Sequence, residues 1–410
     1  MHLVSQVPHW GPTLSKRLPR QSPVHIQIDT QIKQALIERS IAYGLTSGQA
    51  PGHVIALNTS EIPLVQQLWH TRQLASRLSR SKVAQFSIIR KIAGAQLQAT
   101  ELGNEVLQLL STSVGDVGLE YPCHVLEPRI ELFLECAAKR NLLPLWPPFV
   151  PMEEARLLPL VDSLNGFAQD VRQRGSTVSF KAKIAKIANF QGQTDKRYKA
   201  MQHYFRQLFT LYPEGHVIRM DFSYLPHQPV GFSFGEEMHK TVTLHGQALL
   251  EHLTKSWGSS VVGYAWKRDF AAARGYQYHL VAILNGPQVQ ELNCIEQYLG
   301  EHWCQSITNG LGLWFNCHGP WANDFRYRGV SAFKHCVGSM EEHLSLVPVF
   351  MALTDAIAAF KPLGKARPYG MGTLPAKESK KMALLMPQRS AIGNGTSLGS
   401  WPFSKYKGPV

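Results

Sequence analysis

The sequence predicts an α+β protein, in which an antiparallel sheet with helices on one face follows an N-terminal, mainly helical region. Three observations support this fold class. Strand-like runs gather between residues 216 and 316, helical segments separate those runs, and helical periodicity dominates before residue 144. An antiparallel sheet that is covered on one side leaves its other face free for a ligand.

The N-terminal region, residues 1–150, is expected to begin with a loose Pro-rich arm over residues 1–27. Helices follow, one of them starting near Ser60, with a carboxylate and a proline in its first turn, where both are favourable. The apolar residues of segment 88–110 predict one or two more helices. The Pro-rich segment 144–151 cannot form regular structure and marks the boundary to the next domain.

The second domain is expected to cover residues 151–375. Its first strand alternates apolar and polar side chains, so that one set faces a core and Arg219, Asp221 and Ser223 face the other way. The predicted strands are 216–224, 261–270, 276–284 and 313–316, and the predicted helices are 152–174, 181–209, 244–255 and 290–307.

The charge of the chain indicates a polyanionic partner. The formal net charge is +13 and the pI is near 9.5, which favours nucleic acid first and an anionic membrane second. The basic helix 181–209, with aromatic residues between its cations, either lies on phosphates or is the solvated face of a packed helix. Residues 376–410 form a basic tail, expected to be disordered, that adds non-specific DNA affinity or only solubility.

No targeting segment is visible, so a cytoplasmic protein without a membrane partner is expected. Prolines interrupt residues 1–20, and the apolar stretch 344–360 contains Pro348 and Asp355. The six cysteines form no C-x-x-C pair, which argues against a zinc ribbon or a disulfide framework. The pairs Cys317-His318 and His335-Cys336 are an alternative zinc set, although adjacent side chains on an extended chain point apart.

The strand that contains Gln277 and His279 carries the most informative polar pattern. These two side chains point the same way, about 7 Å apart along the strand, and Asp269 lies across a short loop from them. An amide oxygen, an imidazole and a carboxylate on one face predict a site for Mg²⁺ or Mn²⁺. The alternative is a hydrogen-bonded pair with no metal.

Arg219 and Asp221 share one strand face and admit two interpretations. They can form an ion pair that holds the sheet together, or Arg219 can reach a phosphate while Asp221 lies near the metal. The ion pair is the favoured interpretation.

Several segments together resemble a known family. They are Arg219-x-Asp221-x-x-Tyr224, Val262-Gly263-Tyr264-Ala265-Trp266-Lys267-x-Asp269, Gly275-Tyr276-x-Tyr278-His279, Gly300-x-x-Trp303, Gly310-x-Gly312-Leu313-x-Phe315-Asn316-Cys317, Tyr327-Arg328 and Gly364-Lys365-x-Arg367-x-Tyr369-Gly370. In order and spacing they resemble the inovirus-type (filamentous-phage-like) replication initiators, which share a C-terminal domain with the YagK/YfjJ proteins of integrated elements. The resemblance covers residues 152–375.

The resemblance implies a histidine–hydrophobe–histidine nuclease core and rolling-circle initiation of DNA replication in a mobile genetic element. A divalent metal held by Asp269, Gln277 and His279 would polarise a phosphate, and a tyrosine would attack it to leave a 5′-phosphotyrosyl link. Host replication proteins are possible partners. The DNA contacts implied are Arg219, Lys267, Arg326, Arg328, Lys365 and Arg367.

The chain departs from the family pattern at two places. Gln277 replaces the first histidine, although its carbonyl oxygen can still bind Mg²⁺. Phe350 and Leu353 stand where relatives carry the attacking tyrosine and a lysine, and a phenylalanine has no oxygen with which to attack. Either Tyr327 or Tyr369 is the nucleophile instead, or the protein does not nick DNA.

Three functions therefore stay open. The first is a metal-dependent, DNA-nicking initiator, that is, a site-specific endonuclease and strand transferase. The second is a catalytically inactive, DNA-binding regulator or scaffold derived from such an initiator, in which Phe350 lies where the nucleophile would be. The third is a structural protein that coats DNA.

Overall fold

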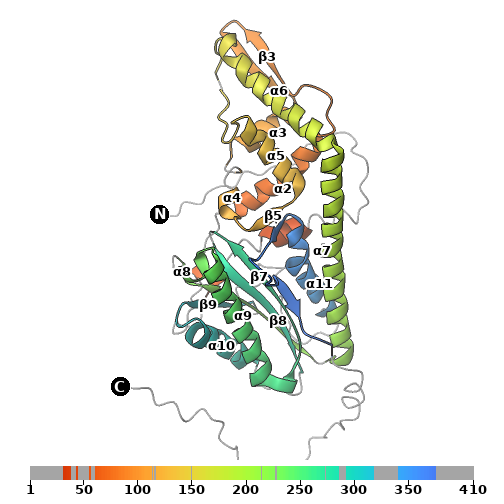
Figure 1. Ribbon diagram of the computed structural model, residues 1–410, viewed down its shortest axis with the longest axis vertical. Helices are drawn as coiled ribbons and strands as arrows, with labels where there is room; N and C mark the ends of the chain where they lie inside the picture. Colours follow the sequence, from red (N-terminus) through yellow and green to blue (C-terminus); the bar gives the residue numbers. More distant parts are fainter. Residues whose placement is uncertain are drawn as a thin grey trace, which may run out of the picture. The chain divides into compact units, whose positions relative to one another are not determined.

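The computed structural model describes residues 31–37, 43–44, 55–56, 61–112, 114, 117–148, 150–213, 215–226, 229–272, 274–285, 292–317 and 340–374. The arm predicted at 1–27 and the tail predicted at 376–410 lie outside these residues. The described part contains helices and antiparallel sheets, which confirms the α+β class (Figure 1).

Five antiparallel strands form the main sheet, in the order β11-β7-β8-β6-β9. The four strands predicted in this region are confirmed, because the alternating residues of β6 and the many β-branched and aromatic residues of β7 fit a pleated surface. Their bounds are His216–Tyr224 (β6), Val261–Ala271 (β7), Gly275–Leu284 (β8), Gly312–Asn316 (β9) and Tyr369–Met371 (β11).

Helices cover both faces of this sheet, so the prediction of helices on one face is wrong. Helices α9 and α10 pack on the face that carries the apolar residues of β6, and α7 and α11 pack on the opposite face (Figure 1). The helices of this domain are α7 (Val178–Leu211), α8 (Pro229–Phe232), α9 (Glu236–Trp257), α10 (Leu292–His302) and α11 (Met340–Met351). The shorter helical turns are η2 (Gly258–Ser260), η4 (Trp303–Ile307) and η7 (Leu353–Ala356).

The second face of the sheet also needs a cover, because part of it is apolar. Val217, Val281 and Ile283 form an apolar patch there, in one core with side chains of α7 and α11. The absent side chain at Gly263 lets α7 approach the strand, since a Cβ at this position would lie 2.2 Å from the Leu208 side chain. All ten residues of β8 are therefore buried.

The N-terminal region has its own core, and a β-hairpin belongs to it. The helices predicted over 88–110 are wrong for residues 88–99, which belong to the hairpin of β3 and β4, and correct for α3. The spacing of the apolar residues fits the period of a helix as well as that of a strand. The turn before Gly94, which has a positive φ, favours the hairpin. The elements are residues 31–37 (helical), β1 (Tyr43–Gly44), β2 (Ile55–Ala56), α2 (Glu61–Leu78), β3 (Phe86–Lys91), β4 (Gly94–Ala99), α3 (Glu101–Leu110), α4 (Val117–Glu120), β5 (His124–Leu126), α5 (Pro128–Lys139) and α6 (Glu154–Ser176).

Contacts cross the predicted domain boundary at residue 150. Helix α6 follows the Pro-rich segment, yet it packs in one core with α2, α3 and α5. Strand β5 pairs with β10 (Ala358–Phe360), which lies more than 200 residues further along the chain. The boundary itself stays a prediction. Within the described residues, no helix combines the length and the apolar character that a membrane crossing requires.

We expect Gly94→Ala to destabilise the protein. Gly94 has φ 123°, and a Cβ there would lie 3.0 Å from the carbonyl oxygen of Met152, which accepts a hydrogen bond from the Ala95 amide. The strained backbone should lower the free energy of unfolding by about 1–3 kcal/mol, measured by urea denaturation. Gly118→Ala is the matched control, because no atom lies within 4 Å of its Cβ. An equal effect of both substitutions would contradict the expected strain at position 94.

Candidate functional site

The strand register gathers the polar side chains singled out in the sequence on one face of the sheet. Lys267 and Asp221 lie opposite His279 on its two neighbouring strands, and Asp269 lies opposite Gln277. Directly opposed residues of antiparallel strands share a face. We call this set the polar layer: Arg219, Asp221, Lys267, Asp269, Arg274, Gln277 and His279.

The polar layer is closed to solvent. Each of its members is at most 6% exposed, and Asp269, Arg274 and His279 are fully buried. The cover comes from distant segments, namely Phe350 of α11, the turn η7 and His124 of β5. A buried polar group is costly unless it is hydrogen-bonded, so the partners of each group define what the layer can do.

His279 is held by a buried carboxylate. Its Nδ1 lies 2.7 Å from Oδ1 of Asp221, and Asp221 forms an ion pair with Arg219, as the favoured interpretation predicted. An ionised carboxylate only accepts, so Nδ1 donates its proton. Nε2 then carries the lone pair, and it has no hydrogen-bond partner among the described residues. Burial, the largest cause, lowers the pKa of His279 to about 4, so that the ring is neutral at pH 7.

Asp269 and Gln277 have protein partners already. Nη1 of Arg274 donates to Oε1 of Gln277, and Nη2 of the same guanidinium lies 3.6 Å from Oδ2 of Asp269. Oδ1 of Asp269 lies 3.3 Å from Nε2 of His124 and accepts from the Phe270 amide at 3.0 Å. One arginine thus bridges the two side chains that were predicted to hold a cation.

Lys267 is paired beneath η7. Its Nζ donates to Oδ1 of Asp355 at 2.5 Å and to Oγ1 of Thr354 at 3.0 Å, and Lys267 is 1% exposed. Asp355 also lies 3.4 Å from Nη1 of Arg197 on α7. This lysine, predicted to contact DNA, is thus buried in an ion pair.

Phe350 lies against the two central groups of the polar layer. Its ring packs edge-on to the imidazole of His279, with 5.0 Å between the centroids, and the guanidinium of Arg219 lies 5.1 Å from its centroid. Phe350, which the resemblance places at the position of the nucleophile, is therefore in ring contact with His279, but it offers only carbon.

Tyr369 lies further away, on the edge strand β11. It is opposite Lys267, so two strand spacings, about 10 Å, separate its backbone from that of His279. The guanidinium of Arg197 stacks on its ring at 4.6 Å. Tyr327, Arg326 and Arg328 lie outside the described residues.

The polar layer fits a divalent cation poorly. The neutral His279, with Nδ1 on a carboxylate and Nε2 unpartnered among the described residues, resembles a metal ligand. However, Arg274 occupies Gln277 and bridges to Asp269, and a cation at this point would meet its positive charge. No group of three His, Cys, Asp or Glu side chains in the described part of the chain could hold a metal ion. The Mg²⁺ or Mn²⁺ site stays a prediction that this arrangement does not support.

Each cation of the polar layer has a carboxylate beside it. Arg219, Lys267 and Arg274 each lie beside a carboxylate, namely Asp221, Asp355 and Asp269 respectively. Sequence reasoning missed His124, Arg274 and Asp355. Arg274 is three residues from Gln277 and could have been found from that spacing, whereas His124 and Asp355 are 145 and 88 residues from their partners and leave no local signal.

Comparison of the chain with protein-family models, with curated proteins and with solved structures gives no match. The relationship to the inovirus-type initiators therefore stays an expectation based on the motifs alone.

We expect Lys267→Met to destabilise the fold strongly, because it leaves Asp355 buried with its main cation removed. The loss should be about 3–5 kcal/mol in urea denaturation, and the double variant Lys267→Met/Asp355→Leu should recover most of it. Lys240→Met breaks a solvent-exposed pair with Glu236 and should change the stability by less than about 1 kcal/mol. Additive losses in the double variant would contradict the expected coupling.

His279 should make the protein sensitive to acid. The unfolded chain protonates this imidazole below about pH 6.5, whereas the folded protein keeps it neutral down to about pH 4. Its contribution to stability is therefore complete above pH 6.5 and is lost as the pH falls from 6.5 towards 4.

The measurement compares urea unfolding at pH 7.5 and pH 5 in the wild type and in His279→Gln, which retains a donor for Asp221. The loss between these pH values should be smaller in the variant by on the order of 1–2 kcal/mol. His239 and His252, whose pKa values burial also lowers to about 4, are present in both proteins and cancel in the comparison. Equal losses would show that His279 does not titrate differently on folding.

Proposed function

We propose that the protein binds DNA without cutting it, as a regulator or scaffold related to rolling-circle initiators. The observation that carries this proposal is the ring of Phe350 against His279 and Arg219. In the family's reaction an oxygen would attack the phosphate beside the histidine, and Phe350 provides none. The cations of the polar layer are also paired with carboxylates, so a phosphate would have to displace Asp221 from Arg219 or Asp355 from Lys267.

A structural role accounts for the polar layer. Buried ion pairs contribute little net stability compared with apolar side chains of similar size, but removing one partner is costly. Such a layer favours the one register in which Asp221 meets His279 and Lys267 meets Asp355. Strongly shifted pKa values arise in structural ion-pair networks as well as in active sites.

Helix α7 offers a surface for DNA. Its sequence contains seven Lys or Arg and one acid, Asp195. Lys196, Lys199, His203 and Arg206 are exposed, and they follow the spacing i, i+3, i+7, i+10, which places them along one side of the helix. Buried apolar side chains, among them Met201, Phe205 and Leu208, lie on the other side. A basic stripe of this kind binds phosphates without sequence preference.

The first test measures DNA affinity. Fluorescence anisotropy with labelled single-stranded and duplex oligonucleotides should show binding that weakens steeply between 50 and 200 mM salt. Lys196→Glu/Lys199→Glu should weaken binding by about tenfold or more and reduce the slope of log K against log salt by about 2. Lys240→Glu/Lys255→Glu on α9 makes the same change in net charge and should leave the affinity within about twofold. Equal effects of the two double variants would contradict a DNA surface on α7.

The second test asks whether DNA is cut. The wild type is incubated with Mn²⁺ and a supercoiled plasmid that carries the DNA flanking its own coding sequence. We expect retained binding, no relaxed circles and no protein attached to a 5′ end. Covalent adducts that disappear in Tyr369→Phe or Tyr327→Phe would overturn the proposal in favour of a nicking initiator with a displaced nucleophile.

A further inference from the structure

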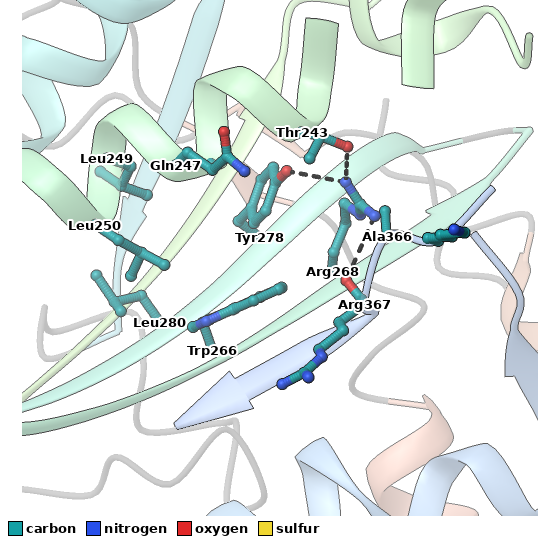
Figure 2. A pocket seen from close by; sticks show the side chains of 12 residues that line it. Thr243, Gln247, Leu249, Leu250, Trp266, Arg268, Tyr278, Leu280, Ala366 and Arg367 are labelled. Carbon is teal, nitrogen blue, oxygen red and sulfur yellow. Dashed lines mark hydrogen bonds between the residues drawn. The ribbon is translucent and has the colours of Figure 1, made fainter. Parts of the chain in front are cut away.

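A pocket lies on the face of the sheet opposite the polar layer. It has a volume of about 310 Å³ and opens between α9, strands β7 and β8 and residues 365–367 (Figure 2). Arg268 forms part of its wall, with Thr243 and Tyr278 beside the guanidinium (Figure 2). None of the residues that line it belongs to the polar layer.

Arg268 is a buried cation without a counter-ion among the described residues. It is 1% exposed, and its partners are the hydroxyl groups of Thr243 and Tyr278, the carbonyl oxygen of Arg367 at 3.4 Å and Nε2 of His239 at 3.3 Å. All of these are neutral, since burial and the nearby Arg268 lower the pKa of His239 to about 4. Nε of Arg268 has no hydrogen-bond partner in the described part of the chain.

The other buried arginines of this sheet differ from Arg268. Arg219 and Arg274 each have an aspartate within their hydrogen-bond network. A guanidinium held out of water without an anion is unfavourable, and a bound anion removes that cost. The pocket beside Arg268 is where such an anion can reach it.

The rim of the pocket adds two more cations. Lys365 and Arg367 are both exposed and line the opening, and no acidic side chain lines the pocket. Neither forms a salt bridge with a described residue, so both are available to an incoming ligand. Three cations around one small pocket favour a group with more than one negative charge, such as a phosphate monoester.

The remaining wall is apolar and aromatic. The rings of Trp266 and Tyr278 lie 6.3 Å apart at an angle of 48°, and the side chains of Leu250 and Leu280 continue the wall (Figure 2). Glycines allow this arrangement, since a Cβ at position 246 would lie 2.5 Å from the Tyr278 ring and one at position 370 would lie 2.6 Å from the Trp266 indole. Planar apolar surfaces of this kind stack on a nucleobase.

We propose that this pocket binds a nucleotide, with the phosphate on Arg268, Lys365 and Arg367 and the base against Trp266 and Tyr278. Gln247 provides hydrogen-bonding groups for the base edge. The nucleotide is either free in solution or the phosphorylated end of a DNA strand. The inference does not depend on the proposed DNA surface of α7, because a free nucleotide would occupy the pocket whether or not α7 binds DNA.

The test is isothermal titration of the full-length protein with thymidine 5′-monophosphate, thymidine, inorganic phosphate and an oligo-dT strand with and without a 5′-phosphate. The mononucleotide should bind at least about tenfold more tightly than thymidine or phosphate alone, since it engages both parts of the pocket. Tighter binding of the phosphorylated strand than of both the mononucleotide and the unphosphorylated strand would identify a strand end as the ligand. Equal binding of the two strands, with the mononucleotide bound in the pocket, would identify a free nucleotide. Absence of binding by every phosphate-bearing ligand would overturn the proposal.

Variants separate the pocket from general electrostatic attraction. Lys365→Glu/Arg367→Glu should weaken nucleotide binding by about tenfold or more, whereas Lys361→Glu, exposed in the same segment and outside the pocket, should change it by less than about twofold. Arg268→Met should abolish binding, and Leu250→Trp, which fills the pocket and keeps its charges, should do the same if circular dichroism shows both proteins folded. Equal effects of the rim and control variants would overturn the assignment.

The α7 variant Lys196→Glu/Lys199→Glu should bind the mononucleotide as tightly as the wild type. Loss of DNA binding in that variant with nucleotide binding retained would show two independent surfaces. Loss of nucleotide binding in the folded variant would mean that the mononucleotide binds α7, and would contradict the assignment of nucleotide binding to the pocket.

Discussion

The ion pair between Arg219 and Asp221, with His279 held by the same carboxylate, is the interaction on which the five-stranded sheet depends. Through Asp221, this interaction connects Arg219 of β6 to His279 of the central strand β8, in which every residue is buried. Because helices close both faces of the sheet, none of these groups can exchange its protein partner for water. The surrounding pairs, Lys267 with Asp355 and Arg274 with Asp269, follow from the same constraint.

Burial of these groups distinguishes a metal-binding nuclease site from a buried ion-pair network, which a sequence motif alone cannot do. A metal nuclease needs donors that converge on an accessible point with net negative charge, whereas a buried network needs charges that cancel. The same residue types serve both purposes. Here Arg274, which the motif does not include, bridges Asp269 and Gln277, and its positive charge decides which of the two chemistries the geometry favours.

The sequence was sufficient for the parts of the fold that depend on local periodicity. Strand β6 alternates clearly, β7 is rich in Val, Tyr and Trp, and parity alone placed Gln277 and His279 of β8 on one face. The hairpin at 86–99 was missed because its apolar spacing also fits a helix. Burial of the polar face was missed because its cover, Phe350 and His124, comes from distant segments, and no local pattern records a contact across 145 residues.

The pairing of β5 with β10 joins residues 124–126 to residues 358–360, far apart in the chain. Residues 124–126 precede the region that resembles an initiator, residues 152–375, whereas their partners, Asp269 beside His124 and Ala358–Phe360 beside β5, lie within that region. A fragment that starts at residue 151 would keep every motif and lose the imidazole beside that carboxylate, together with the partner strand of β10. A fragment cut at residue 151 would therefore expose the buried polar layer to solvent at the place that His124 and β5 cover.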